Sequence, residues 1–384
     1  MSGEIRNEKE VKKKMNRYEA NPFNPQFGKR PKQFIGRELI INEFLQSLDN
    51  MNDPNRTTII TGIRGSGKTA ILSDIHASLD SKAFAIIDVT AMDGMLLEIL
   101  DEFIRNNKGK NWLGKGFGGI QGFSVGAMGF SVGLTKKTDN EPHSFRFVLS
   151  GLLDALKEKK IKTVFLIDEV HNGTPEMREF VVTYQHLVRE EYEVALLMAG
   201  LPSSVNDVLN DKILTFLRRA HRVELENIAI KAVEIAYEQS FSKAGREFSE
   251  NALIESATAT DGYPYLMQLL GYFLFNNGNM NIDSKLVKQM LELSKIELFK
   301  NVHDMLFHEL SAKDHDFLFA MAEDDAVSDF SSIKERLGVS PGYASKYRSR
   351  LLIAGLIKAV EHGKLAFAPP FTREYLKEKQ GFGK

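Results

Sequence analysis

Residues 61–70 read Thr-Gly-Ile-Arg-Gly-Ser-Gly-Lys-Thr-Ala, and Gly62–Thr69 match the pattern G-x-x-x-x-G-K-[ST] at every required position. The β-branched run at 56–60 predicts a buried strand before this loop, and apolar residues at helical spacing over 70–79 predict a helix after it. Glycines let the backbone wrap a polyphosphate, whose charge meets convergent N–H groups and a helix N-terminus. The stretch therefore predicts a nucleoside triphosphate site on a strand–loop–helix unit.

Two side chains of this loop have predicted roles. Lys68 is expected to reach the β- and γ-phosphates, and the Thr69 hydroxyl to bind Mg²⁺. The alternative is a plain glycine turn before a helix, which the flanking strand and helix disfavour. The residues expected to contact the nucleotide are Gly62, Ile63, Arg64, Gly65, Ser66, Gly67, Lys68, Thr69 and Ala70.

A second motif follows about a hundred residues later, where Lys162–Ile167 is an apolar run that ends in Asp168 and Glu169. Such a continuous apolar strand is typical of the centre of a parallel sheet, which binds nucleotides at its carboxyl edge. Asp168 is expected to hold the Mg²⁺ shell, and Glu169 to orient or deprotonate the attacking water. Without the glycine loop, the alternative would be favoured: an ordinary strand that ends in two solvated acids.

Composition excludes several classes of function. The 384 residues hold 50 Lys+Arg against 51 Asp+Glu, so no global charge indicates nucleic acid or membrane, and any DNA contact needs a local patch. Cysteine is absent, which removes disulfides, thiolate zinc sites and cysteine nucleophiles. The polar start and the lack of a membrane-length apolar run predict a cytoplasmic protein that does not bind membranes.

The rest of the chain shows several domains. Strands expected near 57–61, 83–89, 163–168, 193–199 and 221–225 alternate with helices, which predicts an α/β fold with a parallel sheet. From Ala229 we expect helices without strands, and from Ser311 three helices and a β-hairpin, the elements of a winged helix-turn-helix. The predicted domains are a tail and strap (1–30), a P-loop core (31–226) with a glycine-rich hairpin insert (109–134), a helical lid (227–300) and the winged helix-turn-helix (301–384).

The glycine-rich insert repeats Gly-Phe-Ser-Val-Gly at 122–126 and 129–133. The repeat predicts a hairpin that is either a flexible surface loop or an element that contacts DNA or a partner.

The chain resembles AAA+-type P-loop ATPases with a C-terminal winged helix, and is similar to families grouped with origin-recognition-like and STAND ATPases. Besides the two motifs above, the resemblance rests on Asn21-Pro22-Phe23, Gly36-Arg37-Glu38, Gly200-Leu201-Pro202, Gly262-Tyr263-Pro264 and the run 350–357. It implies that Phe34, Ile35 and Gly36 contact adenine and that Pro264 closes the pocket.

Two departures separate the chain from typical AAA+ enzymes. The fourth strand ends in Met198-Ala199-Gly200, without the usual polar sensor, and the lid stretch 262–272 contains no sensor arginine. Both departures favour slow, switch-like hydrolysis of ATP. Arg218 and Arg219, before the fifth strand, are placed where an arginine finger is presented to a neighbouring subunit, although a solvated basic turn is an equal alternative.

Three functions remain open. The first is a Mg²⁺-dependent ATPase, with ATP or ADP as its nucleotide, whose nucleotide state repositions a winged helix on double-stranded DNA. The second is a STAND-like signalling switch that holds nucleotide and binds a protein partner or another copy, and the weakest is a small-molecule kinase. For DNA contact, the helix 341–354 is expected to turn a basic, small-residue face to solvent, and the wing to add a lysine; the residues are Ser345, Lys346, Ser349, Arg350 and Lys364.

Overall fold

The computed structural model describes residues 20–26, 35–79, 83–107, 144–171, 174–308 and 310–381. Phe34 and the predicted glycine-rich hairpin lie outside these residues. The chain divides into two compact units. The first contains Met1–Gly36, Asn227–Ala326 and Phe367–Lys384, and the second contains Arg37–Glu226 and Val327–Ala366.

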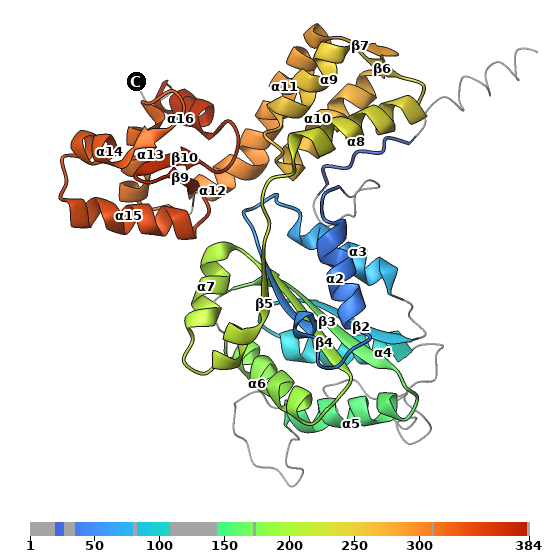
Figure 1. Cartoon of the computed structure of the whole chain (residues 1–384). Helices are drawn as coiled ribbons and strands as arrows, with labels where there is room; N and C mark the ends of the chain where they lie inside the picture. Colours follow the sequence, from blue (N-terminus) through green and yellow to red (C-terminus); the bar gives the residue numbers. More distant parts are fainter. Residues whose placement is uncertain are drawn as a thin grey trace, which may run out of the picture. The chain divides into compact units, whose positions relative to one another are not determined.

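A five-stranded sheet forms the centre of the second unit, and all its neighbouring strands pair in parallel (Figure 1). Thr61 pairs with Gly200, and Thr90 pairs with Asp168, so the strands deliver their last residues to one edge. This edge carries the two predicted nucleotide-binding motifs. In order across the sheet, the strands are β2 (Phe84–Thr90), β3 (Lys162–Val170), β4 (Val194–Gly200), β1 (Thr57–Thr61) and β5 (His221–Glu224).

Helices cover both faces of this sheet (Figure 1). One face carries α2 (Glu38–Ser47) and α3 (Lys68–Ser78), with α3 against β3 and β4. The other carries α4 (Met95–Asn107), α5 (Phe145–Lys157), α6 (Pro175–Arg189) and α7 (Pro202–Asn210). Short 3-10 turns at Pro54–Arg56 and Thr215–Arg219 lead into β1 and β5. The predicted parallel α/β fold is confirmed.

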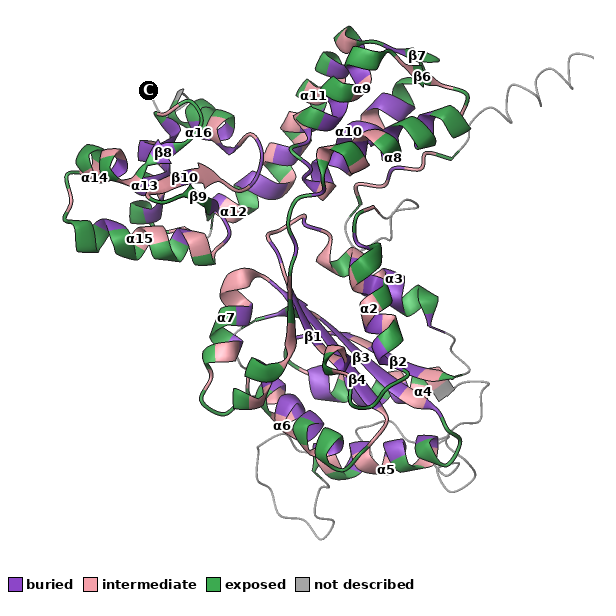
Figure 2. Cartoon of the chain, in the orientation of Figure 1, coloured by how far each residue is buried: buried purple, intermediate pink, exposed green. Residues whose placement is uncertain are grey.

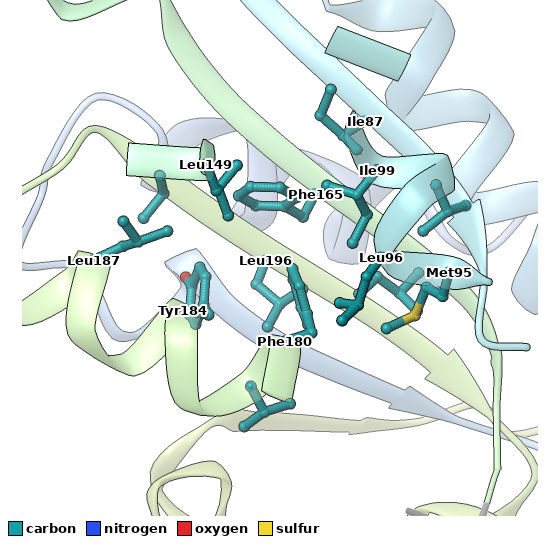
Figure 3. Packing of buried hydrophobic residues seen from close by; sticks show 14 of the residues in the cluster. Ile87, Met95, Leu96, Ile99, Leu149, Phe165, Phe180, Tyr184, Leu187 and Leu196 are labelled. Atoms are coloured by element: carbon teal, nitrogen blue, oxygen red, sulfur yellow. The ribbon is translucent and has the colours of Figure 1, made fainter. Parts of the chain in front are cut away.

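The core of the second unit lies between the sheet and α4–α7 (Figure 3). Phe165 and Ile167 of β3 are part of this core. They are two positions apart, so their side chains point to the same face of the sheet. The Phe165 ring meets that of Phe180 edge to face, with their centroids 5.3 Å apart. Because both faces of the sheet are covered, β4 is buried along its whole length (Figure 2).

Helices dominate the first unit. They are α8 (Ile230–Lys243), α9 (Glu250–Ala259), α10 (Pro264–Asn277), α11 (Ser284–Leu298), a π-helical turn (Phe299–His303), α12 (Asp304–His308), α13 (Ala312–Ala322) and α16 (Thr372–Gly381). The expectation that no strand follows Ala229 before the C-terminal segment is wrong. Two short strands, β6 (Glu247–Phe248) and β7 (Asn281–Ile282), pair in parallel. They were missed because two-residue strands leave no periodic pattern in the sequence.

The strap at residues 20–26 is anchored to these helices. Phe23 is buried, and its ring lies 5.5 Å from that of Tyr237 and 5.6 Å from that of Phe241. The Asn21 amide donates to the Tyr272 carbonyl at 3.1 Å, and the Asn24 N–H donates to the Gln268 side chain at 2.9 Å. The strap is therefore part of the helical core of the first unit.

The C-terminal segment contains α14 (Phe330–Leu337), α15 (Pro341–Ile353) and a three-stranded sheet in the order β8 (Ser328–Asp329), β10 (Lys364–Phe367), β9 (Ile357–Glu361). All three predicted helices, α13 to α15, and the hairpin lie where the sequence predicted them, whereas β8 and α16 were not expected. This succession of elements supports the prediction of a winged helix, which stays a prediction. No helix in the described part of the chain is long and apolar enough to cross a membrane.

Candidate nucleotide-binding site

The glycine loop joins β1 to α3 at the carboxyl edge of the sheet. Gly67, the residue before α3, has φ +95°, a left-handed conformation that residues with a Cβ rarely adopt. Helix α3 begins at the next residue, Lys68, so the N–H groups of its first turn have no partner within the helix. This is the helix terminus that favours a bound anion.

Lys68 folds back over the loop. Its ammonium donates to the carbonyls of Gly62 at 2.8 Å and Ile63 at 3.0 Å. Burial, opposed by the charges of Asp168 and Glu169 and helped by that of Arg64, lowers the pKa of Lys68 to about 8. A phosphate anion favours the charged form of this lysine, so the site gains attraction when an anion arrives.

Thr69 and Asp168 meet across the two motifs. The Thr69 hydroxyl donates to Asp168 Oδ2 at 2.6 Å, although the residues are 99 positions apart in the sequence. Hydroxyl and carboxylate oxygens are ligands that suit Mg²⁺, which usually keeps several waters and binds substrate phosphates. Within the described ranges no three His, Cys, Asp or Glu side chains form a metal cluster. Thr69 and Asp168 are the two residues that would hold such a cation.

A β-bulge positions the two acids. The register between β3 and β4 shifts between Ile167 and Val170, and Glu169 has φ +52°. The Glu169 N–H donates to Asp168 Oδ1 at 2.8 Å, which fixes the Asp168 carboxylate. Glu169 is exposed, so its carboxylate is open to solvent at the sheet edge. Bulges re-aim side chains in this way, and they are frequent beside active sites.

The neighbouring strand adds no polar group. All seven residues of β4 are buried, and its last three are Met198, Ala199 and Gly200. His171, just after β3, is exposed. The site on this unit therefore consists of the loop, Lys68, Thr69, Asp168 and Glu169.

Arg218 and Arg219 lie at the other end of the sheet. Because Thr58 pairs with His221, residues that precede β5 lie at the amino ends of the strands, away from this chain's own phosphate loop. Arg218 Nε donates to the Leu209 carbonyl at 3.0 Å, and Arg219 lines a cavity of about 170 Å³. Both residues are exposed, as an arginine finger for another subunit requires, and that role stays a prediction.

The residues predicted to contact adenine belong to the first unit or lie outside the described chain. Ile35 packs against the helical core of the first unit, and Pro264 is the first residue of α10. Gly36 lies close to the Ile228 side chain, since a Cβ placed on Gly36 would lie 3.3 Å from Ile228 Cγ2. Phe34 lies outside the described residues. Their adenine contacts stay predictions.

Helix α15 presents the predicted DNA-contacting face. Ser340 caps the helix by accepting from the Tyr343 N–H, Ala344 and Leu351 are buried, and Tyr347 is half-buried. Lys364 pairs with Glu361 at 2.9 Å, so its charge is compensated within the wing. The other four predicted contact residues are exposed: Ser345, Lys346, Ser349 and Arg350.

One neighbour of the loop was missed by sequence reasoning. The Leu225 N–H, just after β5, donates to the Thr61 carbonyl at 2.7 Å. A Cβ placed on Gly62 would lie 3.1 Å from the Leu225 Cβ. A single leucine at a strand end carries no motif, so no pattern in the sequence identifies it.

Comparison with known proteins agrees with this architecture. Residues 52–209 match the family model of the AAA domain, and residues 300–376 match a domain of unknown function, DUF8462. The Walker-type ATPase PABY2304 of Pyrococcus abyssi is 18% identical with a TM-score of 0.63, covering 91% of this chain and 97% of that one. The ORC2 protein of Aeropyrum pernix, solved as ADPNP–ADP complexes, is 14% identical with a TM-score of 0.61, covering 94% and 98%. No curated protein matches the chain significantly.

Proposed function

We propose that the chain binds ATP with Mg²⁺ and hydrolyses it slowly. Support comes from the match of residues 52–209 to the AAA domain model and from the AAA+ P-loop fold that the chain shares with origin-recognition-like ATPases. One observation carries this proposal. The 2.6 Å contact between Thr69 and Asp168 joins the ends of two distant motifs at the N-terminus of α3, beside Lys68. The alternative, a plain glycine turn and an unrelated strand that ends in solvated acids, does not explain this direct contact.

Each side chain has a chemical role in the proposed reaction. Lys68 neutralises the β- and γ-phosphates, while Thr69 and Asp168 hold the cation. When bound, Mg²⁺ supplies positive charge that stabilises the transferred phosphoryl group. Glu169 accepts a proton from the attacking water, for which its exposed carboxylate at the bulge is available. The apolar end of β4 offers no further polar group, which supports a low rate.

The proposed hydrolysis is tested by Glu169→Gln. The amide keeps the shape of the side chain but cannot accept the proton, so turnover should fall at least about 100-fold while ATP affinity stays within about threefold. The matched control is Glu158→Gln, an exposed glutamate before the opposite end of β3, which should turn over like the parent. Turnover of Glu169→Gln at the parent rate would show that Glu169 is not the base.

We further propose that the C-terminal segment binds double-stranded DNA under control of the nucleotide. Residues 327–366 contain seven Lys+Arg against three Asp+Glu, in a chain that is nearly neutral overall. Helix α15 contains three of these cations and no acid, and the Tyr343 and Tyr347 rings lie 4.9 Å apart along it. A basic helix with small hydroxyl residues on its exposed face suits contacts with phosphates and base edges.

DNA binding is tested with the double variant Lys346→Ala/Arg350→Ala. Loss of two phosphate contacts should lower duplex affinity and make the slope of log K against log salt shallower by about 2. The control Lys285→Ala/Lys288→Ala removes two exposed lysines from α11 and should bind like the parent. No duplex binding by the parent at low salt would favour the signalling switch, in which nucleotide is held and a protein partner is bound.

A further inference from the structure

A cavity of about 170 Å³ lies at the end of the sheet opposite the phosphate loop. Its lining includes Thr57, the first residue of β1, and Val194, the first residue of β4. All of its lining residues belong to the second unit. We propose that this cavity is a second ligand site, separate from the nucleotide site, which takes a small planar aromatic carboxylate.

The size and the walls of the cavity fit one aromatic ring. An apolar cavity of about 150 Å³ holds a benzene molecule. Tyr184 and Phe216 form two walls here, with their ring centroids 6.0 Å apart. The Tyr184 ring is packed in turn against Phe165 and Phe180, with both centroid distances 6.3 Å (Figure 3). A planar ring can therefore meet two fixed aromatic walls in the stacked or edge-to-face geometries that such rings prefer.

Two hydroxyl groups in the lining leave one hydrogen-bond donor unused. The Thr57 hydroxyl and the Tyr184 phenol lie 3.0 Å apart, so one of them donates to the other. Each has a single proton, and no other residue in the described part of the chain accepts from either. Tyr184 is fully buried, and burial raises its pKa to about 12, so the phenol keeps its proton at neutral pH. An acceptor atom on a ligand would use the remaining donor.

The charges around the cavity favour an anion. Arg56 is compensated within the protein, since its guanidinium pairs with Glu193 at 3.4 Å. Asp53, the acid of the lining, accepts from the Asn55 N–H of its own turn at 2.8 Å. Arg219 is exposed and forms no ion pair with another described residue. A carboxylate suits this lining, because it is anionic and also supplies acceptor oxygens for an unused donor.

The mouth of the cavity is apolar. Met51 and Val188 belong to the lining, yet they are 44% and 41% exposed. Covering these side chains with a ring removes apolar surface from water, which an inorganic anion cannot do. The lining therefore favours an aromatic carboxylate over phosphate or sulfate.

The probe is benzoate, and its neutral isostere benzamide separates the effect of charge from that of the ring. Ligand binding to the full chain is measured by saturation-transfer NMR. The parent should bind benzoate with a dissociation constant of about 1 mM, as expected for so small a ligand. Benzamide should bind at least about fivefold more weakly, because it lacks the charge that Arg219 attracts. A saturating non-hydrolysable ATP analogue with Mg²⁺ should leave benzoate bound, because the phosphate loop lies at the other end of the sheet.

Ala220→Leu fills the cavity from its half-buried wall and should abolish benzoate binding, with the fold checked by circular dichroism. Val188→Trp, which blocks the exposed mouth, is the second variant if the first does not fold. Arg219→Ala should weaken benzoate about fivefold and remove the preference over benzamide. The control Arg189→Ala removes an exposed arginine at the end of α6 that does not line the cavity, and should bind like the parent.

Three results would overturn the second site. They are no saturable benzoate binding by the parent, unchanged binding in the folded cavity-filling variant, and displacement of benzoate by the ATP analogue. A parent that binds benzoate but no nucleotide would overturn the proposed function and leave the second site standing.

Discussion

We expect nucleotide affinity to depend on pH through Lys68. Its pKa of about 8 lies below the usual lysine value because the ammonium is buried. A bound triphosphate would raise this pKa again, because its negative charge favours the protonated lysine. Binding is therefore strongest below pH 8, where the lysine already carries its proton, and weakens as the pH rises above 8. At pH 9 only about a tenth of the free sites are protonated, so affinity should fall about tenfold relative to pH 7.5. Calorimetric titrations between pH 7 and pH 9.5 measure this.

Lys68→Arg is the control for this pH dependence. The guanidinium stays protonated across the range, so this variant should bind more weakly at every pH but without the decline above pH 8. An equal decline in the variant would assign the pH dependence to another group.

At the scale of single residues, the sequence predicted which side chains form the site better than it predicted the backbone conformation that positions them. Lys68, Thr69 and Asp168 follow from motif spacing, and the structure brings them together at the sheet edge. The left-handed Glu169 and the bulge beneath it were not predicted, since a bulge depends on how β3 pairs with β4 and not on local composition.

At the scale of elements, Phe23 attaches the strap at residues 20–26 to the helices of the first unit. Its ring is 2% exposed and packs against Tyr237, Phe241 and Phe275. Phe23→Ala should destabilise the helical unit by about 3–5 kcal/mol, the range for removing a buried phenylalanine. Denaturant unfolding followed by far-UV circular dichroism measures the loss.

Phe147→Ala is the matched control, because Phe147 is 63% exposed on α5 and its removal should change stability by no more than about 0.5 kcal/mol. Equal stability of Phe23→Ala and Phe147→Ala would mean that the strap does not contribute to the fold.

The elements that sequence reasoning found are those with strong periodicity. The five strands of the large sheet and the helices predicted over 70–79 and 341–354 were placed to within a few residues, because their apolar patterns repeat over several positions. The pair β6–β7 and the strand β8 have two residues each and no such pattern. Their existence depends on tertiary contacts, which the sequence alone does not display.

At the scale of the whole molecule, Arg218 and Arg219 predict that hydrolysis depends on assembly. They lie at the sheet end opposite the phosphate loop, so as an arginine finger they would act on a site in another copy. Turnover per protein molecule should therefore rise with protein concentration. Arg218→Ala/Arg219→Ala should remove the rise and leave ATP affinity unchanged, because the two residues do not line this chain's own site. Parent turnover that is independent of concentration would contradict an arginine finger.

The central claim is that the loop at 62–69 and the two acids near the end of β3, Asp168 and Glu169, bind Mg²⁺–ATP. A calorimetric titration of Mg²⁺–ATP into the parent and into Lys68→Ala tests it most directly, because no other lysine replaces this charge on the phosphate loop. We predict one site per chain in the parent and no measurable binding in Lys68→Ala, with both proteins equally folded by circular dichroism. Equal ATP affinity in the two proteins, or none in the parent, would contradict the account.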